Sequence, residues 1–240
     1  MVSPTNLTVI EEGENRFYVG DDGFRRPSAT TILKTFCDTD WTEWAVKQGA
    51  IAVHSALKDD PPSVSQMAFT RMATVGYTAK RDYHAAVGSR VHELIDKGEE
   101  PDALDDRMVR QAYASWQLFL RDYDRYAETL YSELALIGET EDGFKYGGTI
   151  DRVMKVKGGE VLLELKTSRV LSSKAAIQTI AYRDLYAQRF GYIPSDWLTV
   201  RLNKYWLGYE VKRASENCTE LFAAICALYD KRGEDSLWQL

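Results

Sequence analysis

Asp151, Glu164 and Lys166 are the residues whose types and spacing point most directly to chemistry. Hard divalent cations prefer oxygen ligands, and Mg²⁺ needs only one or two carboxylates in addition to water and substrate phosphate. A metal held by the two carboxylates would polarise a scissile phosphate and acidify an attacking water. The lysine is a compact point charge that would orient this water or stabilise the charge building on phosphorus.

A short β-hairpin would bring these three residues to one point. The intervening Gly158-Gly159 supplies positive φ angles without steric cost, as a tight turn requires. If the residues on either side of this pair close the turn, Asp151 faces Lys166 and Val153 faces Glu164. The acids and the lysine then share one face, with the acids as diagonal neighbours roughly 7–8 Å apart at the backbone. A three-residue turn would instead move half of the set to the other face.

Each of these charged residues alone is more simply a solvated strand charge or one half of a cross-strand ion pair. The surrounding sequence, Val161-Leu162-Leu163-Glu164-Leu165-Lys166, weakens that simpler interpretation. Two charges lie among apolar neighbours in it, where an unpaired charge is expensive. The pattern therefore favours a site in which the charges meet a partner.

Gln178, Tyr182, His92 and Glu133 are further candidates. Gln178 and Tyr182 are four residues apart on a predicted helix and share one face, where they would contact a phosphate or a base. The same spacing fits a helix surface with Tyr182 in the core. His92 borders the apolar stripe of another predicted helix, and by itself it is more simply a packed or capping histidine. Glu133, on the preceding predicted strand, either faces the same site or lies on a sheet edge.

The elements that must position these residues fall into two halves. Residues 1–26 are typical of a short β-rich entry, and a mainly helical part extends to residue 130. Its predicted helices cover 29–36 (with Ser28 as N-cap), 41–57, 64–79, 82–96 and 105–130. Over 131–240, predicted strands cover 131–137, 144–157, 160–167, 196–202 and 207–212, with helices over 173–190 and 215–231. The second half therefore reads β-β-β-α-β-β-α, and the whole chain is interpreted as one domain.

The composition is that of an ordinary globular protein, with 240 residues, 45% hydrophobic and 28% charged. The net charge of −6 argues against a nucleic-acid partner, but residues 146–213 hold 12 Lys and Arg against 6 Asp and Glu. No apolar run is long enough for a membrane span, and the first residues do not fit a signal peptide. Three cysteines without paired spacing favour reduced thiols and a cytoplasmic protein.

Together these residues resemble the PD-(D/E)XK nuclease superfamily, specifically its RecB-like exonuclease branch, in its phage-encoded form. The matching motifs, in order, are Gly88-Ser89-Arg90-Val91-His92-Glu93, Gly148-Thr149-Ile150-Asp151 (G-x-x-D), Glu164-Leu165-Lys166 (E-x-K) and Gln178 to Tyr182 (Q-x-x-x-Y). They cover roughly residues 86–212, and Arg26 to Leu33 is more loosely similar to the opening of phage-encoded members. Ile150 stands where the superfamily name has proline. Four motifs in the right order are fairly specific.

The resemblance implies a restriction-endonuclease-like core: a mixed central β-sheet flanked by helices, within an α/β fold. It implies Mg²⁺- or Mn²⁺-dependent cleavage of DNA by Asp151, Glu164 and Lys166. It assigns metal ligation to His92, Asp151, Glu164 and the Leu165 carbonyl, and DNA contact to Gln178 and Tyr182. The cysteine cluster of iron–sulfur members is absent, so no such cluster is expected. Glu133 would favour a second metal.

The leading hypothesis is a DNA exonuclease of recombination or genome processing that acts on linear DNA with a free end. The motifs leave open a structure-specific endonuclease of the same chemistry. A third hypothesis is a non-catalytic DNA-end-binding or assembly subunit on a nuclease fold, which the acidic remainder of the chain makes plausible. A recombination or single-strand-annealing protein as partner and an oligomeric state are also open. Polarity, strand preference and the number of metals are not fixed by the motifs.

Overall fold

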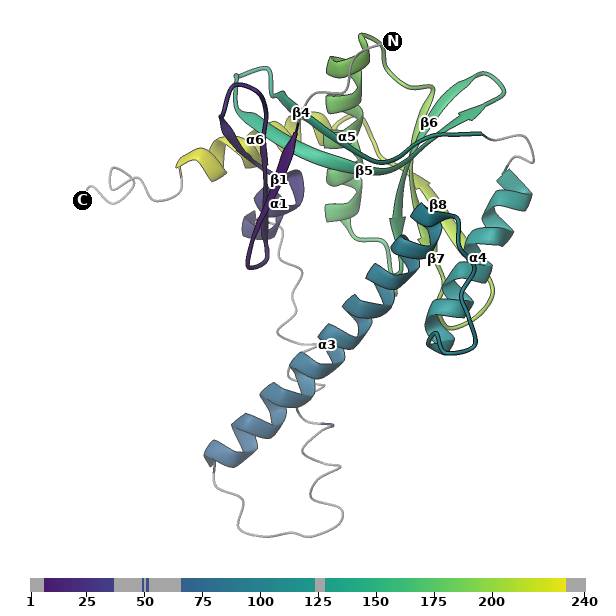
Figure 1. The fold of residues 1–240 in the computed structure, drawn as a ribbon. Coiled ribbons are helices and arrows are strands. Elements are labelled where there is room, and N and C mark those ends of the chain that lie inside the picture. The colour runs from purple at the N-terminus through teal and green to yellow at the C-terminus, as the bar shows by residue number, and fades with distance from the viewer. Residues whose placement is uncertain (1–6, 37–48, 50, 52–65, 124–127, 232–240) are drawn as a thin grey trace.

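The computed structural model describes residues 7–36, 49, 51, 66–123 and 128–231. At its centre is a five-stranded sheet with strand order β4-β5-β6-β7-β8 (Figure 1). The strands are β4 (Glu128–Glu139), β5 (Lys145–Val156), β6 (Gly159–Lys166), β7 (Asp196–Leu202) and β8 (Tyr209–Arg213). Only the β6–β7 pair is parallel among these neighbours. The sheet is therefore mixed and flanked by helices, which confirms the predicted α/β class.

The β5–β6 hairpin differs from the predicted register by two residues. Its last pair at the turn is Val156 with Gly159, so that Lys157 and Gly158 form the loop. Arg152 pairs with Leu163, and Val153 pairs with Leu162 rather than with Glu164 as predicted. The prediction failed because Gly159 belongs to the strand and not to the turn. A shift of two preserves the face of every side chain, whereas a shift of one would reverse it.

This register places the two acids opposite each other, where the prediction had set Asp151 against Lys166. The ladder between β5 and β6 ends at the pair of Arg152 and Leu163. Asp151 and Glu164 are the next residues of the two strands, at the point where the strands stop pairing. The two carboxylates are thus direct neighbours instead of diagonal ones, which brings their charges closer together.

Two hydrophobic cores lie on the two faces of the sheet. Leu162 of β6 packs into a core with α1 (Ala29–Phe36), α5 (Ser173–Phe190) and α6 (Cys218–Lys231). Its neighbours Val161 and Leu163 point to the other face, into a core with α3 (Gln66–Lys97) and α4 (Arg107–Tyr123). β6 is buried on both faces as a central strand of this three-layer arrangement, which explains its nearly continuous apolar sequence.

Helix α5 connects the two parallel strands β6 and β7, as a parallel pair requires. It begins after Ser172, whose backbone is extended, and ends at Gly191, which adopts a left-handed φ of 79°. Both ends and the bounds of β7 were predicted correctly. The sequence signals for the helix ends were local: Gly191, at the C-terminal end of α5, adopts the left-handed conformation without steric cost. This helix carries Gln178 and Tyr182 over the sheet.

A small three-stranded sheet precedes the first helix, as predicted for the entry. Its strands are β1 (Thr8–Glu12), β2 (Asn15–Val19) and β3 (Arg25–Pro27), in that order. Ser28 caps α1, since its Oγ accepts a hydrogen bond from the Thr31 backbone N–H at 2.9 Å. This N-cap and the bounds of α1 confirm the prediction.

Two helix predictions were wrong in their extent. The helices predicted over 64–79 and 82–96 form one continuous helix, α3, because no Pro lies between them to interrupt it. Its first half projects away from the sheet (Figure 1). The helix predicted over 105–130 ends at Tyr123, and β4 begins at Glu128, where pairing with β5 decides the structure. Apart from residues 49 and 51, the predicted helix over 41–57 lies outside the described residues.

The described part of the chain holds no helix that combines the length and the apolar character needed to cross a bilayer.

Candidate metal centre

Three side chains from three elements converge at the end of the β5–β6 ladder. His92 of α3, Glu133 of β4 and Asp151 of β5 each offer a ligand atom, and these atoms all lie within 4.8 Å of one another. His92 Nδ1 is 3.6 Å from Asp151 Oδ1. A neutral imidazole and two carboxylates form a donor set that suits divalent metals. The structure therefore brings together two of the predicted metal ligands, His92 and Asp151, with Glu133, which the sequence offered only as a possible member.

Glu133 has an unusual backbone conformation. On β4 it lies between Ser132, which pairs with Arg152, and Leu134, which pairs with Ile150. It is therefore opposite Asp151 of β5. Its φ of 48° makes it the only non-glycine residue with positive φ in the described part of the chain. Left-handed backbone at a non-glycine residue costs about 1–3 kcal/mol and is concentrated at functional sites. This strain accompanies the placement of the Glu133 carboxylate beside His92 and Asp151.

Glu164 occupies the adjacent position and is 3% exposed. Its Oε1 accepts hydrogen bonds from Lys166 Nζ at 2.5 Å and from Gln178 Nε2 at 2.7 Å. Gln178 Nε2 also bonds the Tyr182 hydroxyl at 2.9 Å. The other carboxylate oxygen, Oε2, is buried and has no hydrogen-bond partner among the residues that the structure describes. A buried carboxylate oxygen without a donor is costly unless a cation completes its surroundings.

The surroundings of these carboxylates disfavour their ionised form. Burial raises the pKa of Asp151 to about 7, against the opposing effects of Lys166 and of the Leu165 backbone N–H, which donates to Asp151 Oδ2 at 2.6 Å. Burial and the neighbouring charge of Asp151 raise the pKa of Glu164 to about 7 as well. Burial also raises the pKa of Glu133. Three acids thus compete for too little positive charge.

The pKa values of Lys166 and His92 are shifted in opposite directions. Burial would lower the pKa of Lys166, but the Glu164 and Asp151 carboxylates outweigh it and the pKa is raised, so that the ammonium stays charged at neutral pH. Burial lowers the pKa of His92, which keeps the ring neutral. Metal ligation needs a neutral imidazole. Lys166 is therefore suited to stabilise negative charge, and His92 is suited to bind a cation.

A divalent cation fits these residues on three grounds. The Oε2 atom of Glu164 lacks a partner, the acids have raised pKa values, and His92 is neutral. The Leu165 backbone lies close enough to the His92 ring to raise its pKa, and both residues line the same cavity, which places Leu165 beside the centre. An oxygen-rich donor set of this kind suits hard divalent cations better than metals that prefer thiolate ligands.

Glycines shape the approach of the helices to this centre. A Cβ at Gly148 would lie 2.4 Å from Cε1 of Tyr182, and a Cβ at Gly147 would lie 2.5 Å from Cδ2 of Tyr18. The Tyr182 ring therefore packs directly on the β5 backbone, from where its hydroxyl reaches Gln178. On the other face, a Cβ at Gly88 would lie 3.1 Å from Thr167 Oγ1, just after Lys166. The motif glycines serve close packing.

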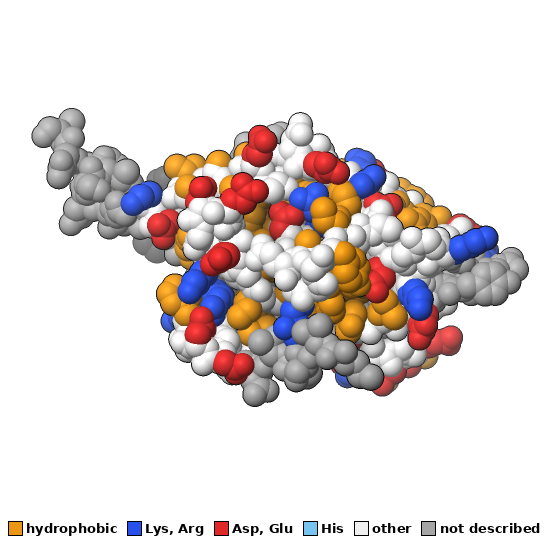
Figure 2. Space-filling model, turned by 90° about the horizontal axis from the view of Figure 1, so that it is seen from above, with side chains coloured by type: hydrophobic (Ala, Val, Ile, Leu, Met, Phe, Trp, Pro, Cys, Tyr) orange, Lys and Arg blue, Asp and Glu red, His pale blue; other side chains and the backbone are white. Residues whose placement is uncertain are grey.

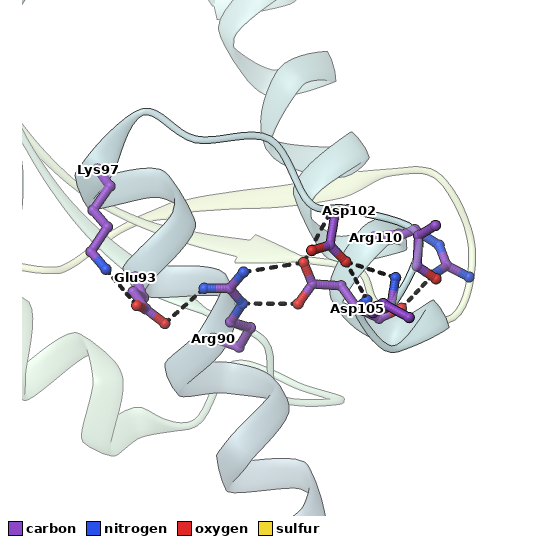
Figure 3. A network of polar contacts seen from close by, with 8 residues as sticks. Arg90, Glu93, Lys97, Asp102, Asp105 and Arg110 are labelled. Atoms are coloured by element: carbon purple, nitrogen blue, oxygen red, sulfur yellow. Dashed lines mark hydrogen bonds and ion pairs between the residues drawn. The ribbon is translucent and has the colours of Figure 1, made fainter.

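The His92 segment of α3 is fixed from its outer side by an ionic network (Figure 3). Arg90 donates to both oxygens of Asp105, at 2.8 and 3.2 Å, and to Glu93 at 3.0 Å. Lys97 donates to the other Glu93 oxygen at 2.6 Å. This network ties α3 to the loop that leads into α4, and the bidentate Arg90–Asp105 pair adds geometric specificity. The helix is thereby held in the rotation that turns His92 to the sheet.

A basic cavity of about 580 Å³ opens beside the centre. His92 and Lys166 line it, together with Lys80, Arg81, His84, Arg169 and Lys204, and none of the lining residues within the described part of the chain is acidic. The face seen in Figure 2 shows acidic and basic side chains interspersed, so uniform positive charge is not general to the surface. A cavity of one sign attracts an anionic substrate. We call these lining residues the basic groove.

Sequence reasoning found only part of this groove. The positive balance of residues 146–213 covers Lys166, Arg169 and Lys204. Lys80 and Arg81 come from α3, 79 and 78 residues before the start of β6 at Gly159, and only the helix packing brings them near. A spacing of four residues between Lys80, His84 and Gly88, which puts them on one helix face, was the available signal.

Gln178 and Tyr182 were predicted to contact DNA. The structure places both side chains beneath the centre, each 5% exposed, where Gln178 bonds Glu164 and Lys166. In this arrangement they hold the catalytic candidates in position, which sequence spacing did not distinguish from direct contact. Their contact with DNA stays a prediction.

Comparisons with known proteins add little to this geometry. No family model matches the chain, and no curated protein matches it. One matching solved structure is described as "Crystal structure of SSO0001", with 15% identity and a TM-score of 0.33. The match covers 50% of this chain and 58% of that chain. A likeness of this degree carries no weight for the fold or the function.

Proposed function

We propose that this protein is a metal-dependent deoxyribonuclease that hydrolyses phosphodiester bonds at the centre of His92, Glu133, Asp151 and Glu164. The observation that carries the proposal is a partner-less carboxylate oxygen of Glu164 within a cluster of raised carboxylate pKa values. Such a cluster is unfavourable in the protein alone and becomes favourable when a divalent cation is bound. The bound Mg²⁺ or Mn²⁺ would supply Lewis-acid polarisation of the phosphate and acidify a water.

The chain's own residues divide the remaining work. Lys166 stays protonated beside the carboxylates, so it stabilises negative charge on a phosphate and does not act as the base. Gln178 bonds both Glu164 and Lys166, which fixes their relative positions, and Tyr182 in turn anchors Gln178. The basic groove runs past Lys166 and offers positive charge to the flanking phosphates.

A nucleic-acid substrate is the class that this charge pattern supports best. The groove is lined by five Lys and Arg residues and by two His residues, and it adjoins the metal centre through His92, Leu165 and Lys166. A small phosphorylated metabolite would need fewer cations, whereas a polyanionic strand contacts several along its length. An exonuclease on linear DNA in recombination or genome processing is the form of this activity that we favour, with a structure-specific endonuclease as the alternative.

The test uses end-labelled linear duplex, linear single strand and closed circular DNA, each with Mg²⁺, Mn²⁺ or EDTA. Wild-type protein is compared with Lys166→Ala and with Lys157→Ala, a control lysine in the β5–β6 turn. We expect metal-dependent loss of linear DNA by wild type and by Lys157→Ala but not by Lys166→Ala. Cleavage of closed circles would select the endonuclease. Retained DNA binding without cleavage under any metal would overturn the enzyme and favour an end-binding or assembly subunit.

A further inference from the structure

The loop between β7 and β8 exposes an aromatic tip at one end of the basic groove. Tyr205, Trp206 and Leu207 follow each other there, with exposed fractions of 41%, 64% and 58%. The Tyr205 and Trp206 rings are tilted, with centroids 6.2 Å apart. Large apolar side chains in this density at a hairpin tip are unfavourable in water unless they meet a partner.

This aromatic tip is firmly held. Asn203 Oδ1 accepts hydrogen bonds from the Tyr205 and Trp206 backbone N–H groups, at 2.9 and 3.4 Å. Ser115 of α4 is fully buried, donates to the Asn203 carbonyl at 2.9 Å and accepts from the Gly208 N–H at 3.2 Å. The rings are therefore presented by a loop tied to the core, which lowers the entropy lost on binding.

The tip is continuous with the groove through two of its residues. Lys204 and Tyr205 line the groove together with Lys166 and His84. Lys204 is 6% exposed, and within the described ranges no ion pair or hydrogen bond engages its ammonium group. His84 Nδ1 is likewise buried without a hydrogen-bond partner. His84 Nδ1, a buried nitrogen without a partner, and Lys204, a largely buried lysine without a counter-ion among the described residues, together indicate an anionic ligand in this cavity of positive charge.

We propose that the aromatic tip is a base-stacking site that holds an unpaired stretch of a nucleic-acid strand. In this arrangement, Trp206 and Tyr205 stack on bases while Lys204 and His84 bind the backbone phosphates that enter the groove. Stacking needs exposed π-faces, which paired bases within a duplex do not offer, so the site selects a single-stranded segment. The inference rests on the proposed function for its place beside the metal centre, but it concerns binding and not hydrolysis.

Charge decides between this occupant and a protein partner. The tip borders a groove whose lining contains five Lys and Arg residues and no acid. A polyanion satisfies the groove and the rings at once, because a single strand alternates phosphates with π-faces. A second copy of this chain would bring a net charge of −6, but an apolar contact with it at the tip would give Lys204 no anionic partner.

The experiment measures binding of a fluorescein-labelled oligo(dT) and of a blunt duplex by anisotropy, in EDTA and in the full-length Lys166→Ala background. Trp206→Ala should weaken oligo(dT) binding about 5–100-fold and duplex binding by less than threefold. Trp206→Phe should retain most of the affinity and Trp206→Leu should lose it, which separates stacking from apolar docking. Phe24→Ala, at an aromatic residue that is 49% exposed on the loop before β3, is the matched control and should change neither.

Further arms distinguish the outcomes. Lys204→Gln should lower the slope of log affinity against log salt by about one, as loss of one phosphate contact requires. Equal losses on single strand and duplex, or full affinity in Trp206→Leu, would overturn the proposal. Sedimentation that shows a dimer dissolved by Trp206→Ala would assign the tip to a second copy and also overturn it. Because hydrolysis is not measured, stacking can hold while the proposed nuclease fails, and the reverse.

Discussion

Helix α3 carries two clusters of charge that differ in how their carboxylates are satisfied. On its outer side, Arg90 and Lys97 neutralise Asp105 and Glu93, and hydrogen bonds with these cations lower the pKa of both acids (Figure 3). On its inner side, His92 meets a buried group of acids whose pKa values are raised. The outer cluster is complete within the protein. Among the described residues, the inner cluster has a single ammonium group, that of Lys166, for its several acids.

The difference separates a positioning device from a binding site. A satisfied ionic network holds elements in place, and its exposed position limits what it contributes to stability. A buried excess of carboxylates destabilises the folded protein and persists only where a ligand compensates it. Charged residues are therefore best sorted by whether their partners lie inside the molecule, and not by their number.

The largest expected effect comes from removing one carboxylate from each cluster. Asp151→Asn should lower metal-dependent hydrolysis by about 1000-fold or more, since it removes a ligand from the centre. The same change should raise the metal-free thermal midpoint at pH 8, because it removes repulsion from Glu164. Asp105→Asn should lower the thermal midpoint, and its hydrolytic activity should stay within about threefold of the wild-type value. Stability changes of the same sign in both variants would contradict the distinction between the clusters.

Glu133 tests whether strain and metal binding coincide at one residue. Glu133→Gln and Glu133→Gly should each weaken Mg²⁺ binding about 10–100-fold, measured by calorimetry, because both remove the carboxylate beside His92 and Asp151. Only the glycine variant relieves the left-handed backbone, so it should be more stable than the glutamine variant by about 1 kcal/mol. Unchanged Mg²⁺ affinity in both variants would exclude Glu133 from the centre.

Much of the fold followed from local signals in the sequence. The Ser28 cap, the Gly191 terminus and the apolar run of β6 each act within a few residues; α1 and α5 were predicted with their observed bounds, and β6 was predicted one residue too late at both ends. The turn at Gly158 and Gly159 was located but placed one residue too late, which shifts the strand register by two, since two adjacent glycines allow more than one loop. Because side chains alternate, this error left the acids on one face and did not harm the site prediction.

The rest depended on contacts that the sequence does not encode locally. The left-handed backbone of Glu133 has no sequence signal, because its cause is the surrounding packing. The burial of Gln178 beneath Glu164 depends on how α5 lies over the sheet. Lys80 and Arg81 join the groove only because α3 continues without a break through the predicted boundary. Residue types and motif order thus indicated the centre, while its electrostatic state required the structure.

A mutation at Gly148 examines how packing supports the inner cluster. Gly148→Ala should destabilise the protein by about 1–3 kcal/mol in urea unfolding, because its Cβ would lie 2.4 Å from the Tyr182 ring. Displacing this ring also moves the hydroxyl that bonds Gln178, so activity should fall about tenfold. In a Tyr182→Ala background, the same glycine change should cost much less. Additive effects in this double-mutant cycle would show that the close contact is not what requires glycine.

The smallest effect is a pH dependence that belongs to the inner cluster alone. The pKa values of Asp151 and Glu164 are raised to about 7 from ordinary values of 3.8 and 4.5. The folded state therefore holds more protons than the unfolded state between about pH 4 and pH 7. Because of these two groups, the free energy of unfolding falls as pH rises through that window. Below about pH 7 protons compete with Mg²⁺ for these carboxylates, and above about pH 7 the repulsion between the ionised carboxylates is greatest.

Thermal melts with and without Mg²⁺ at pH 5.5 and pH 8 measure this dependence. The Mg²⁺-induced increase in the midpoint should be a few degrees larger at pH 8, by roughly 2–4 °C for each kcal/mol of additional binding energy. Asp151→Asn should reduce the increase at both values, while Asp105→Asn should leave it unchanged, because the pKa of Asp105 is already lowered by Arg90. A Mg²⁺ effect that is equal at the two pH values would mean that the cation binds outside the inner cluster.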